Sequence, residues 1–523
     1  MKKIIYSIAF AALLISCGTP SKTADTATKT QVANTVVDPT TYATSITSED
    51  LKELLYTYAS DEFQGRGTGE PGIEIATNYL KNKYVSMGIP AAKGGDNYFQ
   101  EVPLLKQSFP TATMNVNGST FNNFENLIAL SGNESILNAK EIVYVGYGID
   151  SDTYSDYKNI DVKGKIVLAK AGEPKTADGN YVTTGKSEST KWTTGRQAIT
   201  SKGKAAEDHG AKAFIYVDEA QFANYSRFIS NASRHGARFS LKSNTEPLAM
   251  YIANIDLGKA LYSDIETKDA PISVSTELTI NTKNSSEEIT QENVAAFIKG
   301  SEKPDEIIVI SAHLDHEGVK DGEIYNGADD DGSGTVAVLE IAEAFKKAVD
   351  AGHAPKRSIL FLHVTAEEKG LLGSQYYTDI EPLFPLENSV ANLNIDMIGR
   401  IDPKRQGNRN YVYLIGSDKL STELHELSEA VNKKYTNITL DYTFNDDNDP
   451  NRFYYRSDHY NFAKNNIPVI FYFNGTHDDY HRPSDTPDKI EYDLLENRTR
   501  LVFYTAWELA NREQRITVDK SFK

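Results

Sequence analysis

The 523-residue sequence contains a single cysteine, Cys17, and this scarcity excludes several kinds of chemistry. One thiol forms no disulfide within a chain, and Cys17 lies in a short N-terminal segment ahead of the sequence that folds. A cysteine nucleophile is therefore excluded. The sequence also has neither an H-E-x-x-H motif nor a G-x-S-x-G motif, so thermolysin-type zinc peptidases and serine hydrolases with a nucleophile elbow do not fit.

Positive charge is also scarce. The 55 basic residues are outnumbered by 73 acidic ones, which gives a net charge of −18. Nucleic acids and anionic lipid headgroups would be repelled by this excess, so we expect no nucleic-acid partner. After the first residues, no segment of the sequence is long and apolar enough to predict a membrane-spanning helix.

The N-terminal segment, MKKIIYSIAFAALLISC, has the layout of a signal peptide. Two lysines precede an apolar run, residues 4–15, that is too short for an ordinary spanning helix. The run ends in Leu-Ile-Ser-Cys17, which resembles a bacterial lipoprotein box, where the cysteine is acylated and becomes the mature N-terminus. A plain signal peptide with a chance cysteine is the alternative. We expect a signal peptide over residues 1–17, a membrane anchor through lipid on Cys17, and an outer-membrane lipoprotein that faces the periplasm or the cell surface.

The rest of the sequence divides into a tether and two folded parts. Residues 18–45 are rich in Ser, Thr and Ala and poor in large apolar residues, which predicts a flexible tether. From residue 285 onward, apolar strands such as EIIVISA, SILFLHVT and IPVIFYF alternate with amphipathic helices. This alternation predicts an α/β three-layer sandwich around a mostly parallel mixed sheet, formed by residues 46–109 and 285–515.

The middle of the chain has a different pattern. Short apolar strands are separated by turns, and GYG, GKIVL and GAKAFI follow one another in that order. This order resembles the protease-associated domain, a small β-rich module that is inserted into several peptidases. The resemblance implies an inserted domain over residues 110–284.

The segment YNGADDDGSG, residues 325–334, places three aspartates in a row between glycines. Such a segment is most often a solvated turn. The spacing does not match the alternating oxygens of a helix–loop–helix calcium site. A third interpretation is that one aspartate faces a metal ion, which would turn the repulsion between like charges into attraction.

Imidazole and carboxylate groups follow the predicted strands. These groups are His313 with Asp315, Glu367 with Glu368, Asp396, and His481. In open α/β sheets, ligands bind beyond the carboxyl ends of the strands, so we expect these side chains to meet at one edge of the sheet. A set of nitrogen and oxygen donors without thiolate suits zinc or a related metal.

At these motifs the chain resembles zinc peptidase family twenty-eight, the two-zinc aminopeptidases, which also includes glutamate carboxypeptidase and glutaminyl cyclase. The resemblance rests on the segments AHLDHEG, NGADDDGSG, AEEKGLLGS, NIDMIGR, RSDHYNF, DDYHRPSDT and, upstream, DEFQGRGTGEPG. It implies the phosphorylase/hydrolase-like fold of zinc peptidases, two zinc ions and a peptide substrate.

Carried over residue by residue, the resemblance implies that His313 and Asp396 bind one zinc ion and that Glu368 and His481 bind the other. Asp330 would bridge both ions, with Asp329 as the less favoured alternative.

The resemblance also implies a cis peptide bond between Asp330 and Asp331, and it makes Glu367 the general base. Asp315 is then placed to accept the free ring N–H of His313, and Asp485 that of His481. Tyr454 and Tyr455 are candidates for assisting the oxyanion, although core packing is the more ordinary role for each. For His316, His459 and His477 we expect structural roles.

The sequence therefore predicts an exported zinc metallopeptidase that hydrolyses peptide bonds, most simply as an aminopeptidase. A glutaminyl-cyclase-like enzyme, a glutamate-carboxypeptidase-like enzyme and a binding protein on an inactive peptidase scaffold remain alternatives. The preferred side chain of the substrate and the choice between aminopeptidase and carboxypeptidase action stay open.

Overall fold

The computed structural model describes residues 37–234, 236–243, 245–405 and 407–522. The predicted signal peptide and Cys17 lie outside this range. All the elements described below belong to the unit Pro39–Lys523. Residues Thr40–Ala43 form helix α1, in which Tyr42 and Ala43 are buried. Folded structure therefore begins before residue 46, and the tether predicted to extend to residue 45 ends earlier.

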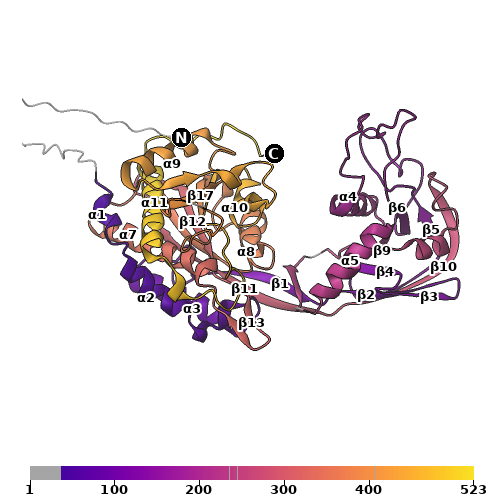
Figure 1. Cartoon of the computed structure of the whole chain (residues 1–523), viewed down its shortest axis with the longest axis horizontal. Coiled ribbons are helices and arrows are strands. Elements are labelled where there is room, and N and C mark those ends of the chain that lie inside the picture. The colour runs from indigo at the N-terminus through magenta and orange to yellow at the C-terminus, as the bar shows by residue number, and fades with distance from the viewer. Residues whose placement is uncertain (1–36, 235, 244, 406, 523) are drawn as a thin grey trace, which may run out of the picture. The chain divides into compact units, whose positions relative to one another are not determined.

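The first sheet mixes parallel and antiparallel strands (Figure 1). In spatial order its strands are β18 (Thr439–Asp441), β17 (Tyr411–Ile415), β19 (Val469–Phe473), β16 (Ser389–Ile395), β12 (Lys303–His313), β15 (Arg357–Val364), β11 (Ser286–Ile298), β1 (Phe99–Gln107) and β8 (Arg238–Leu241). The four central strands β19, β16, β12 and β15 run parallel to one another. Their carboxyl ends therefore meet at one edge of the sheet.

Helices cover both faces of the central strands. The helices that accompany this sheet are α2 (Ser48–Tyr58), α3 (Pro71–Met87), α7 (Gly334–Asp350), α8 (Leu372–Gln375), α9 (Thr422–Tyr435), α10 (His459–Ala463) and α11 (Tyr492–Asn511). Helices α7 and α11 pack on β12 and on each other, and Figure 1 shows α11 beside the sheet. Helix α10 contacts β16 and β19.

The alternation of side chains along β15 separates the two faces. Leu360 and Leu362 lie in one apolar cluster with Phe462 of α10. Phe361, between them, points to the other face, where its ring lies 6.5 Å from that of Phe345 in α7. Because successive strand residues face opposite sides, β15 is buried on both faces, and each of these fully buried side chains contributes about 1.5–3 kcal/mol of apolar burial. The predicted three-layer α/β architecture is confirmed.

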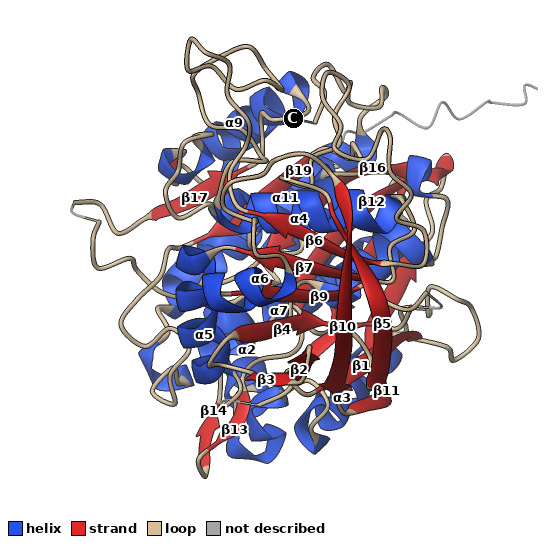
Figure 2. Ribbon diagram, turned by 90° about the vertical axis from the view of Figure 1, so that its right-hand side faces the viewer, coloured by secondary structure: helices blue, strands red, loops and turns tan. Residues whose placement is uncertain are grey.

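Residues between Thr111 and Lys283 form a second sheet, whose strands are labelled in Figure 2. In spatial order these strands are β3 (Ser119–Asn122), β2 (Thr111–Val116), β10 (Ile272–Lys283), β5 (Ser135–Tyr144), β6 (Ile166–Lys170), β7 (Ala213–Val217), β9 (Ala249–Ala253) and β4 (Leu127–Ser131). Three helices accompany it, α4 (Gly195–Asp208), α5 (Glu219–Ala232) and α6 (Ile255–Leu261). This sheet has its own apolar clusters on both faces.

Two further features complete the description. Strands β13 (Gly318–Lys320) and β14 (Glu323–Tyr325) form a hairpin between β12 and the aspartate segment. Among the described residues, no helix has both the length and the apolar character that crossing a membrane requires.

Candidate metal centre

The central strands deliver the predicted side chains to one place. His313 is the last residue of β12, and Asp396 directly follows β16. Glu368 lies in the loop after β15, and His481 lies in the loop after β19. Because these four strands are parallel, their following loops share one edge, as the sequence predicts.

The three consecutive aspartates have three different roles. The carboxylate of Asp329 accepts a hydrogen bond from the backbone N–H of Gly399 and lies 3.1 Å from His477 Nε2. The carboxylate of Asp331 accepts backbone hydrogen bonds from Gly334 and Met397. These two side chains fix the loop to its surroundings and leave the Asp330 carboxylate for another partner. The peptide bond between Asp330 and Asp331 is cis, as the resemblance implies.

A first ligand cluster consists of His313, Asp330 and Asp396. The Nε2 atom of His313 lies 3.2 Å from Asp330 Oδ1 and 3.7 Å from Asp396 Oδ1. The ring of His313 is 1% exposed, and its Nδ1 lies 2.9 Å from the backbone carbonyl oxygen of Asp315. That contact directs Nε2 toward the two carboxylates.

A second ligand cluster shares the Asp330 carboxylate. His481 Nε2 lies 3.0 Å from Asp330 Oδ2 and 3.2 Å from Glu368 Oε1. Asp330 thus presents one oxygen to each cluster. Although burial opposes its charge, contacts with His313, His316 and His481 hold the pKa of Asp330 well below its ordinary value.

The donor atoms fit a metal such as zinc. His313 Nε2, Asp330 Oδ2 and Glu368 Oε1 are buried, and none of them has a hydrogen-bond partner among the described residues. Buried polar atoms are normally paired, so unpaired nitrogen and oxygen atoms that point at one another call for a cation. Ligands at the corners of a tetrahedron around zinc stand about 3.4 Å apart for bonds near 2.1 Å, which matches the separations in both clusters.

Glu367 stands beside the first cluster. Its backbone N–H donates to Asp315 Oδ1 at 3.0 Å, and it lines a pocket together with Asp330 and Asp396. Burial, followed by the neighbouring carboxylates, raises the pKa of Glu367 well above its ordinary value. A cation bound in the clusters would lower the pKa of Glu367.

The structure corrects both predicted orienting carboxylates. The Asp315 carboxylate accepts from the Thr68 hydroxyl and from the Glu367 backbone and stands 3.8 Å from His313 Nδ1, whereas the hydrogen-bond contact of that nitrogen, at 2.9 Å, is with the Asp315 backbone carbonyl. Asp485 does not face His481 Nδ1. Its Oδ2 accepts the backbone N–H groups of Asp329 and Asp330, and it therefore holds the aspartate loop.

The residue that faces His481 Nδ1 is Glu317, whose Oε1 lies 3.2 Å away. Glu317 is in turn paired with Lys320 and with Lys369. A carboxylate that holds the outer nitrogen of a ligand histidine fixes the orientation of the ring. Sequence analysis missed this role, because Glu317 belongs to the segment after β12 and not to the segment that carries His481.

A buried arginine connects the upstream motif DEFQGRGTGEPG to the metal centre. Arg66 is 0% exposed, and its guanidinium donates to the carbonyl oxygens of Leu314, Tyr58, Asn326 and Gly327 at 2.7–3.2 Å. Two of these carbonyls directly precede the aspartate loop, and a third directly follows His313. Arg66 therefore ties together the backbone that presents both clusters.

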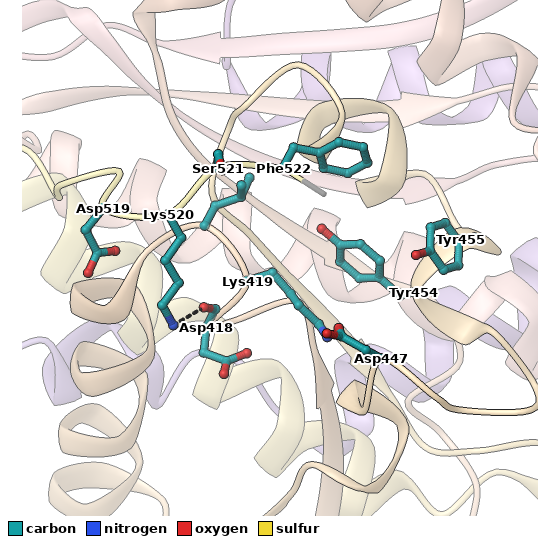
Figure 3. Close-up of a pocket in the computed structure, with 10 residues that line it drawn as sticks. Asp418, Lys419, Asp447, Tyr454, Tyr455, Asp519, Lys520, Ser521 and Phe522 are labelled. Atoms are coloured by element: carbon teal, nitrogen blue, oxygen red, sulfur yellow. Dashed lines mark hydrogen bonds and ion pairs between the residues drawn. The ribbon is translucent and has the colours of Figure 1, made fainter. Parts of the chain in front are cut away.

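The tyrosine beside the centre is Tyr480 and not Tyr454 or Tyr455. Tyr480 lines the pocket with Glu367 and Asp396, and its ring stacks on that of His481 at 3.9 Å. Tyr454 and Tyr455 line a different cavity of about 510 Å³, where Figure 3 shows them close to Phe522.

Two of the other buried histidines, His459 and His477, have the contacts expected of structural residues. His477 pairs with Asp329, and His459 stacks on Phe471 with ring centroids 4.6 Å apart.

Comparison with known proteins agrees with this geometry. The model of peptidase family M28 matches residues 293–506, and the model of the PA domain matches residues 138–245. Residues 293–506 are thus similar to the M28 peptidases and residues 138–245 to PA domains, in agreement with the resemblance in the sequence. Strand β1, which precedes the PA match, pairs with β11, so the sheet that contains the M28 match also includes chain ahead of the PA match.

A solved structure shows the same fold. The aminopeptidase from Aneurinibacillus sp. strain AM-1 is 20% identical, with a TM-score of 0.50, and the alignment covers 92% of this chain and 98% of that one. Two relatives in sequence are also described as aminopeptidases. The probable leucine aminopeptidase 2 of Aspergillus oryzae is 28% identical over 324 residues, which is 61% of this chain and 53% of that protein. Aminopeptidase YwaD of Bacillus subtilis is 24% identical over 310 residues, 57% of this chain and 63% of that protein. The chain thus spans between half and two thirds of the length of these two relatives.

Proposed function

We propose that the protein is a metallopeptidase that binds two zinc ions and removes N-terminal residues from peptides. The observation that carries this proposal is the Asp330 carboxylate, which presents one oxygen to each of two clusters of unpaired ligand atoms, with Glu367 beside them. In the first cluster His313 and Asp396 would hold one ion with Asp330, and in the second Glu368 and His481 would hold the other.

The chain's own residues would position the reactants and move the proton. Bound zinc supplies Lewis acidity, which lowers the pKa of water and polarises the scissile carbonyl. The Glu367 carboxylate accepts the proton of the attacking water and delivers it to the leaving amine. The Tyr480 hydroxyl donates a hydrogen bond to the carbonyl oxygen as negative charge develops there.

The lining of the pocket supports an apolar substrate side chain. Besides the carboxylates and Tyr480, the pocket is lined by the apolar side chains of Met397, Phe453, Phe471 and Phe473 and by the polar side chains of Arg456 and Thr476. Apolar and aromatic walls with a few convergent polar groups are typical of sites that select by shape and burial. We therefore expect peptides with N-terminal leucine or phenylalanine to be the preferred substrates.

The test is hydrolysis of aminoacyl anilides by the full-length chain, with and without a chelator. Glu367→Gln is expected to keep its zinc content and to lose about 10²–10⁴-fold in kcat, because it removes proton transfer without removing a ligand. Glu343→Gln on α7 is the control, since Glu343 is partly buried and pairs with Lys347 away from the centre. Normal turnover by the Glu367→Gln variant would remove the proposed base.

The alternatives are separated by the same assay. If the wild-type chain binds two zinc ions and hydrolyses none of the aminoacyl anilides, two other reactions become the ones to measure. One is cyclisation of an N-terminal glutamine to pyroglutamate with release of ammonia, and the other is hydrolytic release of a C-terminal glutamate. If it turns over no peptide and forms no pyroglutamate despite two bound ions, the chain is a binding protein on a peptidase scaffold.

We also propose that the protein is exported and held at the outer membrane by lipid on Cys17. The basic residues, the short apolar run and the box ending in Cys17 support this proposal. Palmitate labelling of cells expressing the wild-type chain should give a labelled, membrane-associated protein, and Cys17→Ala should abolish the label. Labelling of the Cys17→Ala variant would contradict the proposal.

A further inference from the structure

His316 lies at the second cluster, although the sequence gives it no role. Its ring is 0% exposed, and neither ring nitrogen has a hydrogen-bond partner among the residues that the structure describes. Nδ1 lies 3.0 Å from Glu368 Oε1 and 3.8 Å from Asp330 Oδ2. These are the same two oxygens that His481 Nε2 approaches to 3.2 Å and 3.0 Å.

The two imidazole rings reach these oxygens from different segments. His316 follows β12, whereas His481 belongs to the loop after β19, and their rings meet edge to face with centroids 5.7 Å apart. The two nitrogens lie 3.0–3.8 Å from the two carboxylate oxygens, so both rings face the same pair of acceptors. Separations of this size between nitrogen and oxygen donors are those expected of ligands on one zinc ion.

The surroundings hold the His316 ring in this position. A side chain at Gly327 would place its Cβ 2.5 Å from His316 Cγ, so only glycine leaves room for the ring there. The backbone N–H of His316 donates to the carbonyl oxygen of Arg66 at 3.2 Å. The ring is therefore fixed before any ion binds.

Other buried histidines of the chain show what a structural role looks like. His363 contacts the Tyr84 hydroxyl through Nε2 at 2.8 Å, and His477 contacts Asp329. His459 has no partner for either nitrogen among the described residues, but it stacks on Phe471 and, in the same part of the chain, forms no pair with a carboxylate. His316 differs from all three, because its unpaired nitrogen faces two carboxylates that a ligand histidine also faces.

We propose that His316 Nδ1 is a fourth protein ligand of the second cluster, together with Asp330, Glu368 and His481. This inference rests on the metal binding in the proposed function. The first cluster offers three protein ligands and keeps a position open, whereas the second is closed by four. Closed four-ligand sites are typical of structural zinc and three-ligand sites of catalytic zinc. The second ion is therefore held more tightly, and the substrate meets the first.

The experiment measures zinc per chain as the full-length protein is dialysed against increasing concentrations of a zinc chelator. The wild type is expected to release two ions in two steps. His316→Leu, which has no donor atom, should weaken the tighter step by more than about 100-fold, a larger loss than removing a group that only orients a ligand. The weaker step should stay within about 10-fold of the wild type. His459→Leu is the matched control, since it removes a buried histidine that, among the described residues, forms no pair with a carboxylate, and it should leave both steps unchanged.

A second variant separates ligation from hydrogen bonding. His316→Asp places an oxygen close to the position of Nδ1, so a ligand role predicts zinc affinity within about 10-fold of the wild type. If the ring only donated a hydrogen bond to Glu368, a second carboxylate there would repel it, and His316→Asp would bind zinc more weakly than His316→Leu. That result would overturn the inference, as would two wild-type steps in His316→Leu. A wild-type chain that binds no zinc would instead refute the proposed function.

Discussion

Arg66 gives the sharpest test of how the metal centre is supported. Replacing it by methionine keeps much of the apolar volume and removes every donor. Four hydrogen bonds from the guanidinium are lost, to the carbonyls of Tyr58, Leu314, Asn326 and Gly327. Hydrogen bonds to charged groups contribute about 1.5–3 kcal/mol each. The net loss is smaller than the sum of four such bonds, because the Leu314 carbonyl keeps a second donor in the Tyr58 hydroxyl and the methionine side chain regains some apolar burial. We expect a net loss of about 3–5 kcal/mol.

The assay is thermal unfolding. The transition to follow is the one whose midpoint shifts when zinc is added, because that transition reports the unfolding of the metal-binding domain. A loss of this size lowers Tm by about 6–20 °C, at about 2–4 °C per kcal/mol. Arg66→Lys keeps the charge but has one nitrogen in place of three, so it should fall between the wild type and Arg66→Met. Arg227→Met, on the exposed surface of α5, is the control and should leave Tm unchanged. An Arg66→Met variant that melts within 2 °C of the wild type would refute the reasoning.

Two further predictions concern catalysis and pH. Tyr480→Phe should lower kcat by about 100-fold at unchanged zinc content, whereas Tyr454→Phe should leave kcat unchanged. Equal kcat values for these two variants would contradict the assignment of Tyr480 as the oxyanion donor. Burial raises the pKa of Glu340 on α7 to about 8. The folded state therefore keeps the Glu340 proton at pH values where the unfolded chain, with a pKa near 4.3, has released it. The resulting contribution to folding stability is fully present below about pH 4.3 and is lost as the pH rises through about 8. Glu340→Gln should then raise the free energy of unfolding relative to the wild type at pH 9, by about a few kcal/mol at most, and not at pH 5. A difference that does not depend on pH would contradict the shifted pKa.

The ligand geometry was predictable because it depends on strand order alone. His313 and Asp396 end neighbouring parallel strands, so a strand pattern in the sequence is enough to bring them together. The same holds for Glu368 after β15. The choice of Asp330 among three aspartates needed the resemblance, and the structure gives its physical reason, since Asp329 and Asp331 are occupied by backbone N–H groups.

The orienting contacts were not predictable, because they depend on how loops fold over one another. Asp485 lies close to His481 in sequence, yet it turns toward the aspartate loop, while Glu317 from a distant segment takes the position beside the ring. Tyr454 and Tyr480 are both partly exposed tyrosines in loops, and nothing in their local sequence shows which one faces the pocket. Side-chain direction in irregular backbone is set by tertiary contacts that a periodic pattern does not encode.

The pairing of β1 with β11 has a consequence for how this architecture arose. Gln107 and Ser286 stand opposite each other at the end of the ladder, and Ser108 and Ser285 exchange hydrogen bonds at the next position. The whole PA domain is therefore, in topological terms, the loop of one antiparallel hairpin. A turn of a few residues could join the same two strands, so a shorter ancestral peptidase could acquire or shed the module at this point, with only the edge strand β8 of the first sheet gained or lost alongside it.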